Sequence, residues 1–101
     1  MTLSRDQLVR SLAALEPRLR GEGVTALALF GSRARGDNRT DSDVDVVIDV
    51  ATGARFSLLD LVGVAHEIED ELGLPASIVL RRSLDPALAR TIAREAIRIF
   101  G

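Results

Sequence analysis

Two aspartates separated by one residue, Asp43 and Asp45, begin the largely apolar run "DVDVVIDV". Residues two apart on a strand project from the same face with Cα atoms about 6 to 7 Å apart, so both carboxylates could converge on one divalent cation. Carboxylate oxygens suit Mg²⁺, which keeps several waters and shares its other positions with substrate phosphates. Acid pairs at a strand entrance are more often simply solvated, so this pattern alone is a weak signal for a metal site.

A glycine–serine pair, Gly31 and Ser32, ends the preceding apolar run "VTALALF", ten residues before the acids. Glycine has no Cβ, so a phosphate can approach its backbone closely. The Ser32 hydroxyl and the N–H groups around it can donate to phosphate oxygens. The alternative for this pair is an ordinary turn at the end of a strand.

Arginines follow at positions 33 and 35. The guanidinium groups of Arg33 and Arg35 could reach phosphates or the carboxylates of a partner. Local pairing with Asp37 or Asp41 is an equally good alternative. Asp49 shares the strand face of Asp45 but lies about 13 Å along the strand. That distance excludes a shared metal, so we expect Asp49 to be a polar residue at the strand end.

The elements that must position these residues follow from hydrophobic periodicity and capping patterns. We expect helices over about residues 5–20, 57–72 and 84–100, and strands over 24–30, 43–50 and 76–81, with a polar loop over 32–42. The helix starts are indicated by Ser4 with Gln7, by Ser57 with Asp60, and by Asp85 before Pro86. This order predicts an α/β (α+β) fold in which helices flank a short mixed sheet of about three strands.

Composition limits the classes of function. At 101 residues, a single domain over 1–101 is expected. The fifteen acids and thirteen basic residues, all arginine, give a net charge of −2, so no global field would recruit nucleic acid. There is no cysteine and no long apolar run, so neither thiolate chemistry nor a membrane is expected, and a cytoplasmic location is the default.

The run "GSRARGDNRTDSDVDVVI" resembles the signature of the minimal nucleotidyltransferases (MNT) of the polymerase-beta-like superfamily. The resemblance extends over nearly the whole chain and implies the polymerase-beta-like fold. It implies Mg²⁺-dependent transfer of a nucleoside monophosphate from a nucleoside triphosphate to a hydroxyl. By this resemblance, Gly31 and Ser32 bind the triphosphate, while Asp43 and Asp45 bind the metal and are the catalytic residues. Arg33 and Arg35 are supporting candidates for nucleotide binding.

The sequence departs from the family pattern at one acid. Family members commonly carry a third carboxylate on the following strand, which helps to bind metal and to deprotonate the acceptor hydroxyl, but here Ser77 occupies that place. No acid occurs from residue 73 to residue 84. Glu71 and Asp85 are the nearest acids, and they are better explained as a solvated residue and a helix cap. Losing a general base costs about 10² to 10⁴ in rate. The only histidine, His66, lies away from the signature.

The resemblance also implies a partner, because MNT proteins are often antitoxins that neutralise HEPN ribonuclease toxins. The leading hypothesis is an adenylyltransferase that uses ATP and Mg²⁺ to modify such a toxin. One alternative is a catalytically weakened binding module that neutralises the toxin by forming a complex. The other is a small-molecule (antibiotic) nucleotidyltransferase. Homo- or hetero-oligomers are compatible with each hypothesis.

Overall fold

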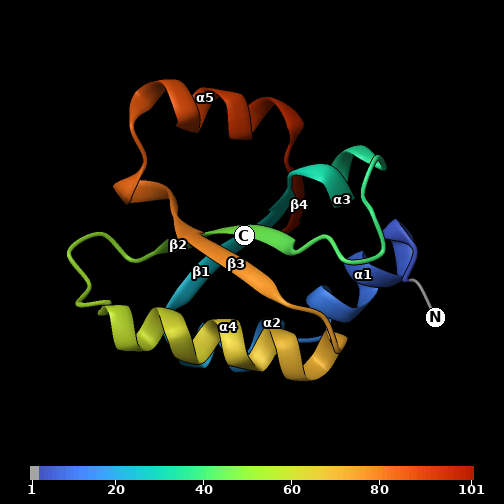
Figure 1. Ribbon diagram of the computed structural model, residues 1–101. Helices are drawn as coiled ribbons and strands as arrows, with labels where there is room; N and C mark the ends of the chain where they lie inside the picture. Colours follow the sequence, from blue (N-terminus) through green and yellow to red (C-terminus); the bar gives the residue numbers. More distant parts are fainter. Residues whose placement is uncertain (1–2) are drawn as a thin grey trace.

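The computed structural model describes residues 3–101, and its helices lie on both faces of a central sheet (Figure 1). The elements are, in order, α1 (Arg5–Ala13), α2 (Glu16–Gly21), β1 (Val24–Phe30), α3 (Ser32–Arg35), β2 (Val44–Val50), α4 (Leu58–Leu72), β3 (Ala76–Leu80), a 3₁₀ turn (Arg81–Ser83), α5 (Pro86–Glu95) and β4 (Ile97–Phe100). The strand order is β3-β2-β1-β4, with β1 antiparallel to both neighbours and β2 parallel to β3. The predicted α/β class with a mixed sheet is confirmed.

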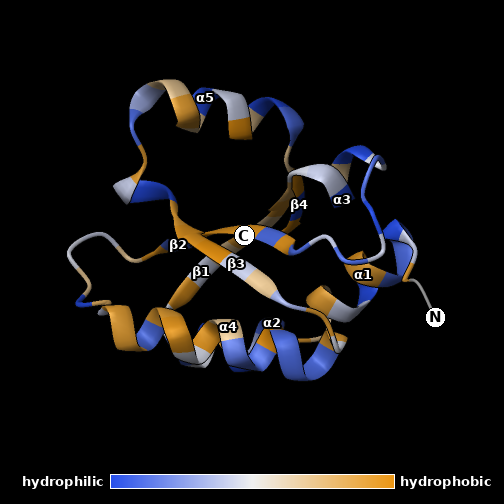
Figure 2. Cartoon of the chain, viewed as in Figure 1, coloured by the Kyte–Doolittle hydropathy of each residue, from blue (hydrophilic) through white to orange (hydrophobic). Residues whose placement is uncertain are grey.

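The two faces of the sheet differ in depth of burial. Helices α1, α2 and α4 cover one face and enclose the main apolar core, which includes Leu8, Leu12, Leu19, Val46 and Ile68. Helix α5 covers the other face over a smaller cluster of buried residues, Ala28, Val47 and Ile92. Hydrophobic positions therefore line both sides of the sheet (Figure 2). The acids of β2 belong to the α5 face, because alternate residues of a strand point to opposite faces.

The predicted first helix over residues 5–20 is in fact two helices, α1 and α2. The chain bends at Ala14 and Leu15, where the Leu15 N–H donates to Leu12 O, three residues back. Pro17 explains the break, since it has no N–H and its ring would collide with the carbonyl of Ala13 in a continuous helix. The capping box of Ser4 at the start of α1 is present as predicted.

The sheet has a fourth strand within the described residues, so the prediction of about three strands was wrong. The predicted last helix over 84–100 ends at Glu95, and the backbone of Ala96 is extended (φ −70°, ψ 142°). The following residues form β4, whose Phe100 and Ile97 pair with Leu27 and Leu29 of β1. No glycine or proline marks this change, so only pairing with β1 distinguishes strand from helix here.

The segment predicted as loop over 32–42 begins with the short helix α3. Gly31 precedes it with φ 78°, and Gly36 ends it with φ 87°. Both values favour glycine, because a Cβ makes positive φ costly.

In the described range 3–101, no helix is long and apolar enough to cross a membrane.

Candidate active site

The Gly31 turn and the Asp45 carboxylate are in direct contact. Gly31 follows the end of β1, and Asp45 is paired in register with Phe30, the last residue of that strand. A Cβ placed on Gly31 would collide with Oδ2 of Asp45 and lie in tight contact with its Cγ and Cβ. Glycine is therefore required at position 31 both for its positive φ and for the close approach of an acid. The pairing of β1 with β2 brings the two halves of the predicted metal–phosphate site together.

The acid pair places two negative charges side by side, and Arg35 compensates them only in part. Asp43 is exposed, whereas Asp45 is half-buried. Burial and then the charge of Asp43 raise the pKa of Asp45 above its usual value, the Arg35 guanidinium opposes this shift, and Glu95 adds to it. Two neighbouring carboxylates without a directly bound basic side chain are the kind of site that a divalent cation stabilises.

Arg33 is a buried part of the scaffold. Its side chain is 2% exposed, with Nε donating to Ser42 O at 3.0 Å and Nη2 to Thr40 O at 3.2 Å. These carbonyls belong to the segment that leads into Asp43. These hydrogen bonds are with neither Asp37 nor Asp41, the two acids with which the sequence analysis considered local pairing of Arg33 as an alternative. They indicate that Arg33 fixes the path of the loop that carries the acid pair.

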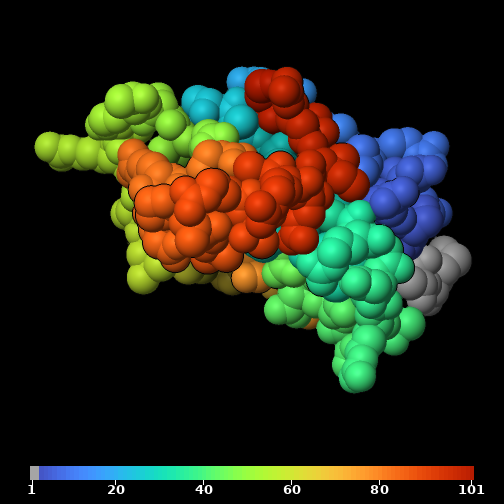
Figure 3. Space-filling model, turned by 90° about the horizontal axis from the view of Figure 1, so that it is seen from above, coloured from blue at the N-terminus to red at the C-terminus, as the bar shows by residue number. Residues whose placement is uncertain are grey.

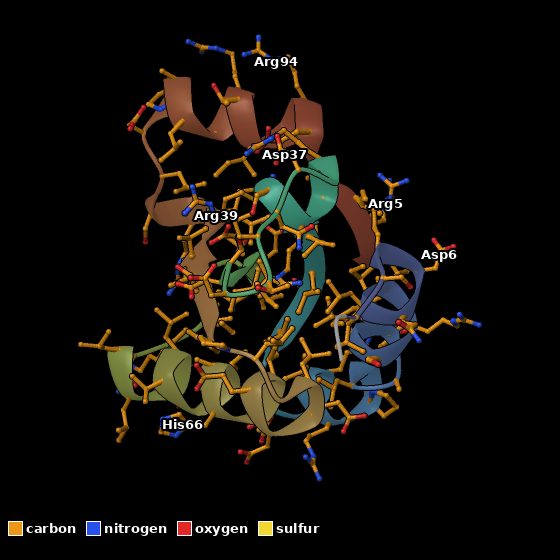
Figure 4. All side chains as sticks on the ribbon, turned by 45° about the vertical axis from the view of Figure 1, so that its right-hand side comes forward. Arg5, Asp6, Asp37, Arg39, His66 and Arg94 are labelled. Carbon is orange, nitrogen blue, oxygen red and sulfur yellow. The ribbon has the colours of Figure 1, made fainter. Side chains whose placement is uncertain are left out.

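Arg35 lies on the surface between two carboxylates. Its Nε donates to Asp37 Oδ2 at 3.1 Å, as one of the sequence alternatives expected, and its Nη1 donates to Glu95 Oε2 at 3.1 Å. These two hydrogen bonds raise the pKa of Arg35 further above its usual range. Asp37 lies at the edge of α3 that faces α5 (Figure 4).

Glu95 is the residue of this region that the sequence did not single out. It is the last residue of α5, 64 positions after Gly31, and its Oε1 accepts from Gly31 N at 3.2 Å. The sequence showed only that Glu95 is an acid near the end of a segment expected to be helical. Periodicity alone gives no reason to place it beside a turn so distant in the chain.

Ser77 lies directly beside Asp45 in the sheet. The parallel register of β2 and β3 pairs Asp45 with Ser77 and Val47 with Val79. Neighbouring strands are about 4.8 Å apart, and paired residues of parallel strands point to the same face. Ser77 is exposed, so this hydroxyl stands on the α5 face next to the acid pair.

The other acids named in the sequence lie as expected. Asp85 caps α5 by accepting from Leu88 N, and Glu71 is exposed on α4. Asp49, the penultimate residue of β2, forms an ion pair with Arg81, with Nε to Oδ1 at 3.0 Å. His66 projects from the outer side of α4, away from the sheet (Figure 4).

A cavity of about 470 Å³ lies on the same face of the sheet as the acid pair but farther along it. Its lining includes Asp49, Arg81, Ala93 and Phe100, and it does not include Asp43 or Asp45. The buried Val47 lies between Asp45 and Asp49 on β2. The cavity is therefore lined by none of the site residues that the sequence predicts.

The donor set fits Mg²⁺ shared with a phosphate better than a closed metal site. Among residues 3–101, no three side chains of His, Cys, Asp or Glu come together to hold a metal. Asp43 and Asp45 provide hard oxygen ligands, which leaves further positions for water and phosphate oxygens. A metal that binds together with its nucleotide needs no third protein ligand.

Comparisons with known proteins show which family the chain resembles. Residues 6–99 match the family model of the nucleotidyltransferase domain. The chain is 33% identical over 98 residues to the protein adenylyltransferase MntA of Thermococcus cleftensis, covering 96% of this chain and 97% of that one. A solved structure described as a minimal nucleotidyltransferase is 35% identical, has a TM-score of 0.76 and covers 94% of this chain and 95% of that one.

Two toxin–antitoxin crystal structures share the fold at lower identity. One, with AMP-PNP, has a TM-score of 0.75 at 19% identity and covers 90% of this chain and 73% of that one. The other holds a tri-AMPylated HEPN toxin of Shewanella oneidensis in complex with its MNT antitoxin, with a TM-score of 0.70 at 17% identity, covering 96% of this chain and 72% of that one.

Proposed function

Because the chain belongs to the nucleotidyltransferase domain family, we propose that it transfers the adenylyl group of ATP to a HEPN toxin and thereby acts as an antitoxin. The name of the Thermococcus relative supports a protein as the acceptor. The AMPylated HEPN toxin in the Shewanella complex supports the partner class. The AMP-PNP in the other toxin–antitoxin structure supports an adenine nucleotide.

The contact of Asp45 with Gly31 is the observation that carries this proposal. It places a carboxylate against a buried turn whose backbone a phosphate can approach. In the proposed arrangement, Gly31 and Ser32 donate to the triphosphate, and Asp43 and Asp45 hold Mg²⁺. Arg35, whose Nη1 shares the Glu95 carboxylate with Gly31 N, is the arginine proposed to contact the phosphates. Arg33 supports the site through the loop rather than by touching the nucleotide.

The chemistry is a displacement at the α-phosphorus. The acceptor oxygen forms a bond to this phosphorus, the bond to the bridging oxygen of the β-phosphate breaks, and pyrophosphate leaves. When bound, Mg²⁺ neutralises phosphate charge and aligns the attacking and leaving oxygens. Asp43 and Asp45 would position the triphosphate through the Mg²⁺ that they hold, and not by direct contact with its oxygens. The hydroxyl proton of the acceptor needs a base, and Ser77 does not supply a carboxylate for this purpose.

The test uses a HEPN toxin as the acceptor, ATP labelled at the α-phosphate, and MgCl₂. We expect label on the HEPN protein with the wild type and none after addition of EDTA. Parallel reactions with GTP, CTP and UTP determine the base preference. An unlabelled HEPN protein under saturating ATP, with a folded wild-type chain that forms the complex, would exclude the enzymatic function.

A second candidate function is neutralisation by binding alone. Ser77 favours it, because the position beside Asp45 carries a hydroxyl that is far less basic than a carboxylate. Under this alternative, the double variant Asp43→Asn with Asp45→Asn still forms the complex and still suppresses toxicity in cells. Under the proposed function, the same variant forms the complex but no longer protects.

A further inference from the structure

The carboxylate of Glu95 holds two hydrogen-bond donors of the candidate site at the same time. Its Oε1 accepts from the backbone N–H of Gly31 at 3.2 Å, and its Oε2 accepts from Nη1 of Arg35 at 3.1 Å. The Glu95 side chain is only 25% exposed, and Gly31 is buried. In the space-filling view from above, the C-terminal end of α5 rests against the α3 segment (Figure 3).

These two donors are among those that the proposed function gives to the triphosphate. A buried N–H makes one strong hydrogen bond, so a carboxylate and a phosphate oxygen compete for it. An anion paired with a guanidinium excludes a second anion in the same way, because both need the same N–H directions. The acid also adds negative charge beside Asp45, which opposes the approach of an anionic nucleotide.

We propose that Glu95 is an internal competitor of the nucleotide: its carboxylate occupies the phosphate-binding donors of Gly31 and Arg35, and the triphosphate must displace it to bind. This inference rests on the proposed function. It assigns to α5 a role in setting nucleotide affinity, through a side chain that mimics a phosphate anion. Glu95 thus sets the affinity of the site for the nucleotide and is not a ligand of the bound nucleotide.

A role as the missing base agrees less well with these contacts. Both carboxylate oxygens of Glu95 already accept from strong donors, one each. A base must instead accept a proton from the acceptor hydroxyl in reach of the reacting phosphorus. The exposed Ser77 marks the place beside Asp45 where the third acid is expected, and Glu95 reaches the site from α5 on the side of the Gly31 turn.

Displacement of Glu95 has a consequence for the end of the chain. Glu95 is the last residue of α5, and β4 begins two positions later at Ile97. The contacts with Gly31 and Arg35 therefore tie the α5–β4 junction to the nucleotide site. Displacement of the carboxylate breaks these two hydrogen bonds. Nucleotide binding should therefore make the α5–β4 junction more flexible while it orders the Gly31 turn.

The first experiment measures AMP-PNP binding by calorimetry, with MgCl₂ and again with EDTA. Glu95→Gln keeps the shape of the side chain but removes the charge, and Glu95→Ala removes the contact. We expect both variants to bind AMP-PNP about tenfold more tightly than the wild type, because a larger fraction of the molecules has its donors free. Glu71→Gln, which removes an exposed acid of α4, is the matched control for net charge and should leave the affinity unchanged.

The second measurement needs no variant. Hydrogen exchange of the amides of residues 95–100 should become faster when the wild type binds AMP-PNP with Mg²⁺, whereas the amides of residues 31–35 should become slower. In Glu95→Ala, which removes both hydrogen bonds, exchange at the junction should already be fast without nucleotide.

The outcomes separate this inference from the proposed function. Weaker or unchanged binding by folded Glu95→Gln, or slower exchange at residues 95–100 on nucleotide binding, would overturn the role of Glu95 while leaving the nucleotide site intact. Equal tightening by Glu71→Gln would also overturn it, since the effect would then be general charge. Absence of AMP-PNP binding by the folded wild type and by both Glu95 variants would reject the proposed function itself.

Discussion

Asp45 and Asp49 lie on the same strand and on the same face of the sheet, yet their surroundings differ. Asp49 accepts from Arg81 through both oxygens, at 3.0 and 3.2 Å. Asp45 has the acid Asp43 as a neighbour, and its pKa is raised by burial and by that charge. The acid at one end of the strand is neutralised by an ion pair within the protein, whereas the acids at the other end form no ion pair with a basic side chain of the described residues.

Strand β3 and the turn after it produce this difference. The parallel register places Ser77 beside Asp45, and it ends with Leu80 beside Ile48, one position before Asp49 and Arg81. The same neighbouring segment thus gives a hydroxyl to one acid and a guanidinium to the other. A half-exposed ion pair such as that of Asp49 contributes up to about 1 kcal/mol to stability. Asp45 is therefore a candidate metal ligand because no basic side chain among residues 3–101 pairs with it, whereas Asp49 is already paired with Arg81.

The largest expected effect comes from replacing Asp45, but not Asp49, with the corresponding amide. Asp45→Asn should lower the rate of adenylyl transfer by at least about 10³-fold, because the charge that holds the metal is lost. Asp49→Asn is the matched control on the same strand and should leave the rate unchanged. Labelling of the HEPN protein with ATP measures both rates, and equal losses in the two variants would remove the distinction between the two ends.

The next largest effect is an expected gain. Ser77→Asp places a carboxylate beside Asp45, where a base could accept the hydroxyl proton, and should raise the transfer rate about 10²-fold. Single-turnover labelling at saturating ATP isolates this step from binding. Ser83→Asp, on the exposed 3₁₀ turn, is a control for added charge. A folded Ser77→Asp that is no faster than the wild type would show that the missing acid does not limit the reaction.

A smaller effect is expected from Gly31→Ala. The new Cβ meets the Asp45 carboxylate at a backbone φ of 78°, so the free energy of unfolding should fall by about 1 to 3 kcal/mol. Urea unfolding measures this change, and calorimetry with AMP-PNP should show weaker binding. In the double variant Gly31→Ala with Asp45→Ala, part of the lost stability should return, because the collision is relieved. An additive loss in the double variant would contradict the close contact.

The smallest effect concerns a second acid pair, which lies away from the site. Burial, followed by a hydrogen bond to Glu67 and the charge of that residue, raises the pKa of Glu22 from 4.5 to about 7. The folded state therefore holds a proton that the unfolded state has lost, so this group makes stability fall as the pH rises from 4.5 to about 7.

Glu22→Gln should remove this pH dependence and raise Tm above pH 7, where the like charges of the wild type repel each other. Thermal unfolding of both proteins from pH 4 to pH 8 measures the change. Glu71→Gln should leave the wild-type profile unaltered. If the Tm of the wild type does not fall across this pH range relative to the Tm of Glu22→Gln, the raised pKa of Glu22 would be contradicted.

Local sequence signals predicted much of the fold. The strand Val24–Phe30, the capping box of Ser57 with Asp60, and the cap of Asp85 are present as expected. These features depend on side chains within a few residues of one another, which is why they can be read locally. Strand β4 was missed because "IRIF" follows a helix without a breaker and becomes a strand only by pairing with β1.

The sequence by itself determined the types of group in the candidate site and their order along the chain. The glycine–serine pair and the two aspartates lie within fifteen residues, and the strands that carry them are adjacent in the chain. Only the tertiary structure decided which other side chains meet them. The register of β3 puts Ser77 beside Asp45, and the packing of α5 brings Glu95 to Gly31 across 64 positions. Contacts over such separations depend on how whole elements pack, which no local pattern of residues specifies.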